Sequence, residues 1–526
     1  MKTRSTTPIM IMIFILLFVW LQQSYAQTEH PAVKSGNEVA SNSPDTKKIL
    51  PPLDLSETEH ILQIGDSKLK YSATAGVLPI KNESGDYECR IFFINYNLKN
   101  KKDDIRPITF VFNGGPGASS AYLHLAALGP KGILLNEKEG FPAPPGNLVD
   151  NNYTWLTFTD LVFIDPVGTG YSRCDSTKQK TEGDNSEARV WGVREDLESL
   201  AKFIRLFLTR TDRWLSPKFI VGESYGGFRV AALSDLLQSD YGIGLNGVVL
   251  ISPALEFSLL RGDEYSLLPW IVDIPSYAAT ARFHGKAPGS ISDEKNPRTD
   301  LKEIENFAVK DLLPALAMGD TGAISAKLGS YIGLSAETVS RLDSRIPASM
   351  FSKKLLQESG RLISVYDGSF TSIDPDPGNP YSSGEDPLLI QINTLLTAGI
   401  NSYLREQLKY KTDLPYEILN KEVSRKWNWR SGLQWGQGYV GVAENLKHSM
   451  SINKDLKAFI AHGVFDLVTP YFGSLVVTRQ MSLDPTIAPH LILKVYEGGH
   501  MFYTNVTSRR MFFNDARDFF NHAVEK

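Results

Sequence analysis

The sequence predicts an α/β fold with a mostly parallel central sheet, covered by helices on both faces. Short apolar runs rich in β-branched residues alternate with segments whose apolar residues recur every three or four positions. The first pattern is typical of buried parallel strands and the second of amphipathic helices. A long segment rich in aromatic and polar residues interrupts this alternation, and we expect it to form a largely helical cap insertion.

The bulk composition is that of an ordinary globular protein. The chain has 526 residues, 42% hydrophobic and 22% charged, with a formal net charge of −4. This charge gives no indication of nucleic acid or an anionic membrane as a partner. The histidines lack the spacing of metal ligands, so we predict no metal and no other cofactor.

The N-terminus has the three parts of a signal peptide. A positively charged start precedes an apolar run at 9–21, and a small-x-small site follows at 24–26. The apolar run is short for a membrane span of about 20 residues. We therefore predict a signal peptide at 1–26 and an exported protein, periplasmic or secreted, without a membrane anchor after cleavage. The polar, proline-containing stretch 27–56 is expected to be a flexible leader.

The chain contains two cysteines, Cys89 and Cys174. An exported compartment permits a disulfide between them, and the sequence leaves open whether they meet. Two cysteines do not make a disulfide-stapled scaffold, so stability has to come from a large core.

Residues 57–255 are predicted to form the first part of the core. The stretch 60–96 alternates in short bursts between glycines, which indicates antiparallel strands at a sheet edge. An amphipathic helix is expected at 187–209 because its apolar residues fall on one face. Compact apolar runs predict buried strands at 108–112, 161–164, 219–221 and 247–251.

The second half of the chain is predicted to contain the cap and the rest of the core. We expect the cap at 256–442, with helices near 301–316, 335–342 and 388–408. The core pattern returns over 443–526, with strands at 456–461 and 491–495 and helices at 472–480 and 508–524.

Ser224 lies in the context of a nucleophile elbow. The strand at 219–221 is followed by Gly222-x-Ser224-x-Gly226 and then by a run with helical spacing. A sharp strand-to-helix turn crowds the backbone, which explains the two glycines. The turn exposes the serine above a helix N-terminus, whose unpaired N–H groups favour negative charge. A chance match in an ordinary turn is the alternative.

An acid and a histidine follow in the order that this type of site requires. Asp466 comes just after the strand at 456–461, and His500 just after the strand at 491–495. We expect His500 to take the proton of Ser224, and Asp466 to fix and stabilise the imidazole ring. His462 is a competing histidine, more simply explained as a loop residue bonded to backbone. Asp466 could also be a plain turn aspartate.

A glycine-rich loop, N-G-G-P-G at 113–117, follows the strand at 108–112. Such a loop supplies one of the two oxyanion donors in hydrolases, and we assign the backbone N–H groups of Gly115 and Tyr225. A phosphate cradle would need a P-loop lysine or G-x-G-x-x-G spacing, and the loop has neither.

These motifs together resemble the serine carboxypeptidases, which have the α/β-hydrolase fold. The similarity runs from about residue 60 to the end, and its four main motifs occur in the family's order. They are N-G-G-P-G-A-S-S at 113–120, G-E-S-Y-G-G at 222–227, F-D-L-V at 465–468 and G-G-H-M at 498–501. N-x-Y-T-W at 151–155 and D-P-V-G-T-G-Y-S at 165–172 are similar to further family signatures.

The resemblance implies an exopeptidase that releases the C-terminal residue of peptides or proteins, best at acidic pH. It also implies that Asn113 and Glu223 bind the terminal carboxylate of the substrate. Glu223 and that carboxylate must then share a proton. Two positions depart from the family: Val111 replaces a usual tryptophan of the carboxylate site, and Ala118 replaces a common cysteine.

Two other functions remain open at this point. Some relatives are acyltransferases or esterases on the same scaffold, and a non-catalytic binding protein could also keep the fold. The complete order of Ser224, Asp466 and His500 argues against a binding protein. The pair Asn113 and Glu223 favours the carboxypeptidase over the acyltransferase or esterase.

Overall fold

The computed structural model describes most of the chain after the leader. The described ranges are 54–81, 87–99, 105–133, 141–174, 190–260, 265–293, 295–381, 384–432 and 438–525. The predicted signal peptide at 1–26 and nearly all of the leader at 27–56 lie outside them. Within these ranges, every helix is too short or too polar to cross a lipid bilayer.

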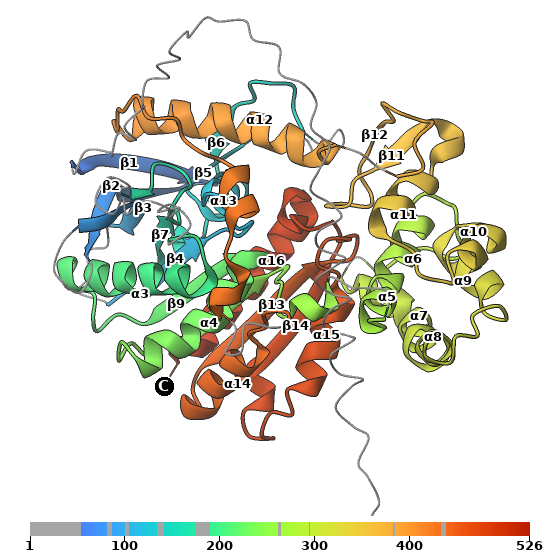
Figure 1. The fold of residues 1–526 in the computed structure, drawn as a ribbon. Helices are drawn as coiled ribbons and strands as arrows, with labels where there is room; N and C mark the ends of the chain where they lie inside the picture. The colour runs from blue at the N-terminus through green and yellow to red at the C-terminus, as the bar shows by residue number, and fades with distance from the viewer. Residues whose placement is uncertain are drawn as a thin grey trace, which may run out of the picture. The chain divides into compact units, whose positions relative to one another are not determined.

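A mixed sheet of ten strands forms the centre of the fold (Figure 1). Its order is β1-β2-β3-β7-β4-β9-β10-β13-β14, with β8 paired to β3. Strands β1 to β3 pair antiparallel at one edge, and the six strands from β7 to β14 are parallel. The bounds are β1 (Ser56–Ile64), β2 (Ser67–Lys81), β3 (Tyr87–Leu98), β4 (Ile108–Phe112), β7 (Asp160–Ile164), β8 (Arg173–Cys174), β9 (Lys218–Glu223), β10 (Gly247–Ile251), β13 (Lys457–Gly463) and β14 (Leu491–Tyr496). The predicted mostly parallel sheet is confirmed.

Helices cover both faces of the sheet. Helices α3 (Val193–Arg210), α4 (Tyr225–Ser239) and α14 (Ala443–Ile452) pack on one face, and α16 (Val506–Val524) and α12 (Pro387–Ser402) pack on the other. Successive strand residues point to opposite faces. Ile220 therefore joins the core under α3 and α4, whereas Val221 joins the core under α16.

Helix α3 begins at Val193, later than the predicted start at 187. Gly192 is extended, with φ −153°, and its backbone pairs with Asn428. This pairing commits the chain before Val193 to an extended path, which helical periodicity could not reveal. Residues 187–189 lie outside the described ranges.

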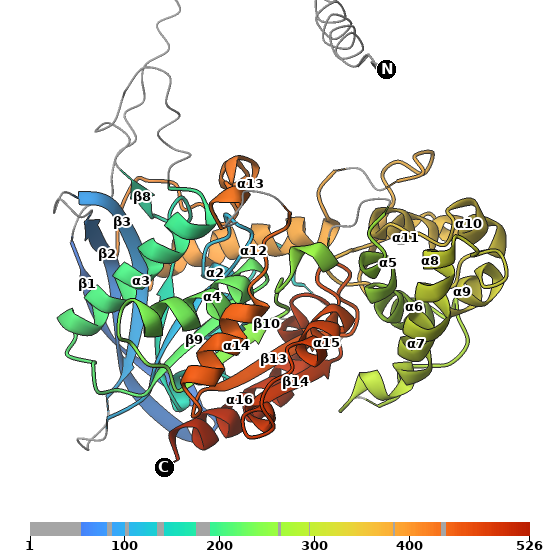
Figure 2. The same cartoon turned by 60° about the horizontal axis from the view of Figure 1, so that its bottom comes forward.

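The predicted cap segment, 256–442, is mainly helical, but its helices pack in three places (Figure 2). One group shares a core with Phe465, Phe472 and Val495. Helix α12 belongs to the core on the α16 side of the sheet instead, and α13 (Lys421–Lys426) contributes Val423 to the core on the α3 side. The first group comprises α5 (Leu268–Val272), α6 (Ile274–Phe283), α7 (Lys302–Phe307), α8 (Leu313–Met318), α9 (Ser325–Ile332), α10 (Ala336–Arg341), α11 (Ala348–Lys354) and the hairpin β11 (Arg361–Ile363) and β12 (Thr371–Ile373).

Smaller elements complete the core. Helix α15 (Tyr471–Gln480) packs against α5 and α6, and the hairpin of β5 (Lys131–Ile133) and β6 (Leu148–Asp150) lies next to α12. The short helix α2 (Ala121–Leu123) continues into the π-helix η1 (His124–Leu128).

Cys89 and Cys174 form a disulfide. They are direct partners in the antiparallel register of β3 and β8, which brings their backbones together. This answers the question that the sequence left open.

Candidate active site

The backbone around Ser224 has the strained turn that the elbow motif predicts. Strand β9 ends at Glu223, α4 begins at Tyr225, and Ser224 between them has φ 61° and ψ −123°. Residues other than glycine rarely adopt this combination of φ and ψ, and such backbone strain costs about 1–3 kcal/mol. A Cβ atom on Gly222 would lie 2.1 Å from the carbonyl oxygen of Gly226. The turn is therefore closed to larger residues.

Neighbouring strands fix the orientation of the elbow. The backbone N–H of Ser224 donates to the carbonyl of Ile251 at the end of β10 (2.9 Å). The next residue, Ser252, donates its hydroxyl to the carbonyl of His500 (2.8 Å). The Ser224 side chain is partly exposed, and it makes no hydrogen bond to any described residue, His500 included. Such catalytic contacts often tighten only when substrate is bound.

His500 and Asp466 are brought together as predicted. His500 Nδ1 lies 2.9 Å from Asp466 Oδ2, and both side chains are buried. The carboxylate also accepts the backbone N–H groups of Val468 (2.8 Å) and Thr469 (3.0 Å) and the Thr469 hydroxyl (2.8 Å). Because a carboxylate can only accept, Nδ1 carries the proton and leaves Nε2 free to act as a base.

The charges of this pair reinforce each other. Burial opposes ionisation of Asp466, but the attraction of His500 and the hydrogen bonds outweigh it, so the pKa of Asp466 lies below its usual value. Burial likewise opposes the charge on His500, yet Asp466 and the Glu223 carboxylate raise the pKa of the imidazole above its usual value. A base must be neutral, so this direction opposes the acidic optimum implied by the resemblance.

Glu223 lies in a second buried cluster beside the elbow. Asn113 Nδ2 donates to Glu223 Oε2, and the Tyr503 hydroxyl lies 2.8 Å from Oε1 and 2.9 Å from Oε2. The N–H of Leu123 donates to Asn113 Oδ1 (3.1 Å), which turns the amide nitrogen toward Glu223. The two residues predicted to hold a terminal carboxylate are therefore in direct contact.

The Glu223 carboxyl group titrates near neutrality. Burial raises its pKa to about 7, although the charge of His500 and the hydrogen bonds from Tyr503 and Asn113 act in the opposite direction. The side chain is only 3% exposed. At mildly acidic pH the group is thus protonated and can donate a hydrogen bond.

The glycine-rich loop lies against the N-terminus of α4. A Cβ atom on Gly114 would be 2.5 Å from the backbone nitrogen of Tyr225, so the two backbones touch there. Gly115 is exposed, with φ 97°. This arrangement places the predicted donors, the N–H groups of Gly115 and Tyr225, on adjoining backbone segments next to Ser224.

A buried ion pair missed by the sequence reasoning supports this loop. Arg229 on α4 donates from Nε to Asp196 Oδ2 on α3 (2.7 Å) and from Nη1 to the Asn113 carbonyl. Asp196 falls on the same helical face as Val193 and Leu200. This acidic residue on an otherwise apolar helix face could have indicated that a buried cationic side chain lies nearby.

A segment of the predicted cap contacts the loops that carry Asp466 and His500. Residues 365–368, between β11 and β12, pack against the loops that carry Asp466 and His500, and the Tyr366 ring meets the imidazole edge-on at 5.4 Å. Four hydrogen bonds make the connection: Leu467 N to Val365 O (3.0 Å), Gly368 N to Phe465 O (2.9 Å), His500 N to Tyr366 O (2.6 Å) and Gly499 N to Asp367 Oδ2 (3.0 Å). These contacts could not be predicted from the sequence.

Two other buried histidines, His462 and His124, each bond through Nε2 to a hydroxyl group. His462 is the penultimate residue of β13, not a loop residue as predicted, and its Nε2 lies 2.8 Å from the Ser474 hydroxyl. Burial lowers the pKa of His462 to about 4 and that of His124 to about 3. In the described ranges, no three His, Cys, Asp or Glu side chains are grouped as a metal site would require.

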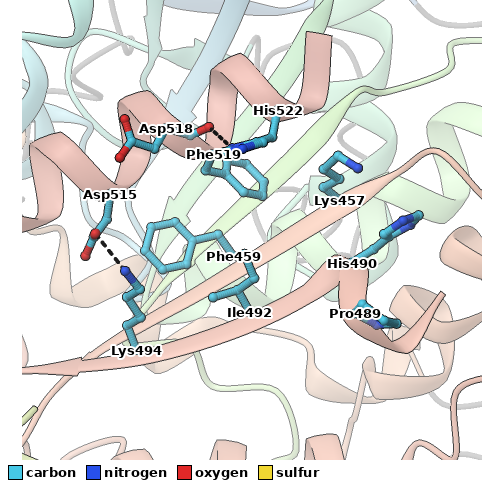
Figure 3. Close-up of a pocket in the computed structure, with 10 residues that line it drawn as sticks. All are labelled: Lys457, Phe459, Pro489, His490, Ile492, Lys494, Asp515, Asp518, Phe519 and His522. Atoms are coloured by element: carbon cyan, nitrogen blue, oxygen red, sulfur yellow. Dashed lines mark hydrogen bonds and ion pairs between the residues drawn. The ribbon is translucent and has the colours of Figure 1, made fainter. Parts of the chain in front are cut away.

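A separate pocket of about 360 Å³ lies beside the amino-terminal parts of β13 and β14 (Figure 3). Its wall is formed by Phe459, Ile492 and Phe519, near the amino ends of β13 and β14. The pair Lys494–Asp515 (2.7 Å) borders it on one side. The predicted site residues follow the carboxyl ends of the parallel strands, so this pocket is distinct from them.

Comparison with known proteins identifies relatives of the chain. Residues 65–257 match the family described as serine carboxypeptidase. Serine carboxypeptidase-like 8 of Arabidopsis thaliana is 31% identical over 193 residues, and that match spans 34% of this chain and 41% of the relative. The chain thus spans about two fifths of the length of this relative. Serine carboxypeptidase-like 41 of the same plant is 25% identical over 447 residues, which cover 81% of this chain and 80% of the relative.

A solved structure supports the fold. The crystal structure of a prohormone-processing carboxypeptidase from Saccharomyces cerevisiae superposes with a TM-score of 0.53, at 16% identity, over 85% of this chain and 91% of that one. The resemblance predicted from the motifs is therefore confirmed: the chain is related to the serine carboxypeptidases and has an α/β-hydrolase fold.

Proposed function

We propose that the chain is an exported serine carboxypeptidase that hydrolyses the C-terminal peptide bond of peptides or proteins. The observation that carries the proposal is the pairing of Asn113 with a protonatable Glu223, next to Ser224 and the His500–Asp466 pair. An esterase or acyltransferase needs the serine and the histidine, but not a site for a terminal carboxylate.

The first half of the reaction transfers the acyl group to Ser224. Its Oγ attacks the carbonyl carbon of the last peptide bond, and its proton moves to His500 Nε2. The negative charge that develops on the carbonyl oxygen is stabilised by the N–H groups of Gly115 and Tyr225. The C–N bond then breaks, His500 returns the proton to the amine, and the C-terminal amino acid leaves.

The second half hydrolyses the acyl-enzyme. Water attacks the ester carbon and gives a proton to His500 Nε2. The bond to Ser224 Oγ breaks, the serine takes the proton back, and the shortened peptide leaves. Asp466 remains ionised throughout and stabilises the imidazolium of each step.

Glu223 and Asn113 select substrates with a free C-terminus. The protonated Glu223 carboxyl donates to the substrate carboxylate, and Asn113 contributes the second N–H of its amide. Above neutral pH, Glu223 loses its proton and the two negative charges repel each other. KM for a free-acid peptide should then rise with pH, whereas kcat should not fall.

The proposal also covers the division of the chain into a core and a cap. We propose that 256–442 forms a cap inserted between two core parts, 57–255 and 443–526. The helices of this segment and its contacts with the catalytic loops support that division. Export rests on the N-terminal signal pattern, and mass spectrometry of the mature N-terminus from the native host tests it.

The deciding experiment compares N-blocked dipeptides ending in a free acid, an amide or an ester, at pH 4 to 9, in wild type and Glu223→Gln. We expect KM for the acid to rise with pH in wild type, and the rise to be flattened in Glu223→Gln. The amide and the ester should show no such rise. Parallel curves for acid and amide would favour the esterase or acyltransferase. Absence of turnover with every substrate would favour a binding protein.

A further inference from the structure

Tyr503 contacts both oxygens of the Glu223 carboxyl group. It lies in the 3-10 turn η11 (Phe502–Thr504), three residues after His500, and is fully buried. Its carbonyl accepts the Arg509 Nε–H (2.8 Å), which fixes the turn to α16. Burial and the Glu223 charge raise the pKa of Tyr503 well above its usual value. The phenol is therefore a lasting hydrogen-bond donor.

The donors around Glu223 determine which oxygen carries its proton. Asn113 Nδ2–H donates to Oε2, so that oxygen is an acceptor. A protonated carboxyl group has one O–H and one acceptor oxygen. The proton therefore sits on Oε1, while Tyr503 donates to Oε2 alongside Asn113. When Glu223 ionises, Tyr503 reaches either oxygen.

We propose that Tyr503 is a positioning residue for the terminal carboxylate of the substrate, because it orients Glu223 so that Oε1–H donates to that carboxylate, and that it thereby sets the alkaline limit of exopeptidase activity. The inference rests on the proposed carboxypeptidase function. Tyr503 touches Glu223 and does not itself need to touch the substrate.

Several groups besides Tyr503 act on the charge of Glu223. The His500 imidazolium, from the loop after β14, favours ionisation, and Asp466, from the loop after β13, opposes it. Tyr122 on α2 and Tyr366 after β11 also face this charge. All four remain in place when only the Tyr503 hydroxyl is removed, so a change in the pH profile reports on that hydroxyl.

The test is Tyr503→Phe, assayed with an N-blocked dipeptide as the free acid and as the amide. Tyr503 stabilises the ionised form of Glu223, so its loss raises the pKa of that group. The pH at which KM for the acid begins to rise should move up by roughly one unit, as expected for a lost hydrogen bond to a charged group. At pH 5 the less oriented carboxyl should raise KM roughly fivefold. The amide kinetics and kcat should stay unchanged.

Two controls separate this role from a structural one. Tyr496→Phe removes another buried tyrosine hydroxyl bonded to a carboxylate, Asp515 (2.7 Å), away from Glu223. It should leave the KM profile unchanged. In a Glu223→Gln background, Tyr503→Phe should cause no pH shift. If Tyr503→Phe does not fold, Tyr503→3-fluorotyrosine keeps the shape, strengthens the donor, and should move the KM rise to lower pH.

The outcomes of the test are distinct. Absence of peptidase activity in wild type, or parallel acid and amide curves, would overturn the proposed function. An active wild type with an acid-specific KM rise, combined with an unshifted profile in Tyr503→Phe or in the fluorotyrosine variant, would overturn the role of Tyr503 alone. Equal KM increases for acid and amide would likewise mean a merely structural role.

Discussion

The two buried carboxyl groups of the site, Asp466 and Glu223, respond to burial in opposite ways. Both side chains are shielded from water, and burial is the largest influence on the pKa of each. Asp466 nevertheless has a pKa below its usual value, whereas the pKa of Glu223 is raised to about 7. Glu223 is the last residue of β9, Asp466 follows β13, and only β10 lies between these two strands.

Their partners explain the difference. Asp466 accepts hydrogen bonds from two backbone N–H groups, from Thr469 and from His500, a partner that can carry a positive charge. Glu223 accepts bonds from Tyr503 and Asn113, and both are neutral. Environments that push two pKa values apart assign different roles to chemically similar groups. One carboxyl is suited to stabilise a cation, and the other to share a proton with a carboxylate.

Ser224→Ala should have the largest effect, because it removes the proposed nucleophile and leaves both carboxyl groups in place. We expect kcat to fall by about 10⁴-fold or more. Binding of a free-acid peptide should keep its wild-type affinity and pH dependence, measured by calorimetry. Turnover close to that of wild type in a sequence-verified variant would exclude Ser224 as the nucleophile.

Asp466→Asn removes the first carboxyl group of the comparison, the one whose pKa is lowered. The amide cannot stabilise the imidazolium and favours the wrong tautomer, so kcat should fall by about 10⁴-fold with little change in KM. Asp515→Asn, at the separate pocket, serves as the control and should retain its activity. Steady-state kinetics on both variants decide the assignment, which fails if Asp466→Asn retains most of its turnover.

Glu223→Gln removes the second carboxyl group of the comparison, the one whose pKa is raised. The folded-state pKa of Glu223, about 7, is above its ordinary value of 4.5. The unfolded chain therefore ionises first, and the stability contribution is lost as pH rises from about 4.5 through 7. The unfolding free energy of wild type relative to Glu223→Gln should fall by about 3 kcal/mol between pH 4 and pH 8. Urea denaturation at a series of pH values measures this, and a constant difference would contradict the raised pKa.

Thr469→Val should have the smallest effect. It removes one of four donors from Asp466 and keeps the shape of the side chain. A single hydrogen bond contributes about 1 kcal/mol, so we expect a similar loss of stability and a fall in kcat of tenfold or less. A loss as large as that of Asp466→Asn would mean that the threonine hydroxyl, which also lies 3.0 Å from His500 Nδ1, takes part directly.

Much of this arrangement could be predicted from local patterns. The strands carrying Ser224, Asp466 and His500 are short apolar runs, and the strand-end position of each residue follows from chain order. The contact of Tyr503 with Glu223 could not be predicted, because nothing in the sequence distinguishes this tyrosine from an ordinary core residue. Asp196 and Arg229 are also far apart in sequence and meet only through the packing of α3 on α4.

The contacts of residues 365–368 were also beyond prediction, since a four-residue loop has no periodicity to read. The predicted start of helix α3 was wrong for a related reason. Gly192 looks compatible with a helix until its backbone is seen to pair with Asn428.

The hydrogen bonds between residues 365–368 and the loops of Asp466 and His500 restrict how the protein can be altered. The conformation of the loops of Asp466 and His500 is stabilised in part by hydrogen bonds to a segment outside the sheet. A chimaera that received a relative's segment in place of 256–442 would also lose these four hydrogen bonds. Recombination and laboratory evolution should therefore succeed more often when the breakpoints spare 365–368 than when they replace the insertion whole.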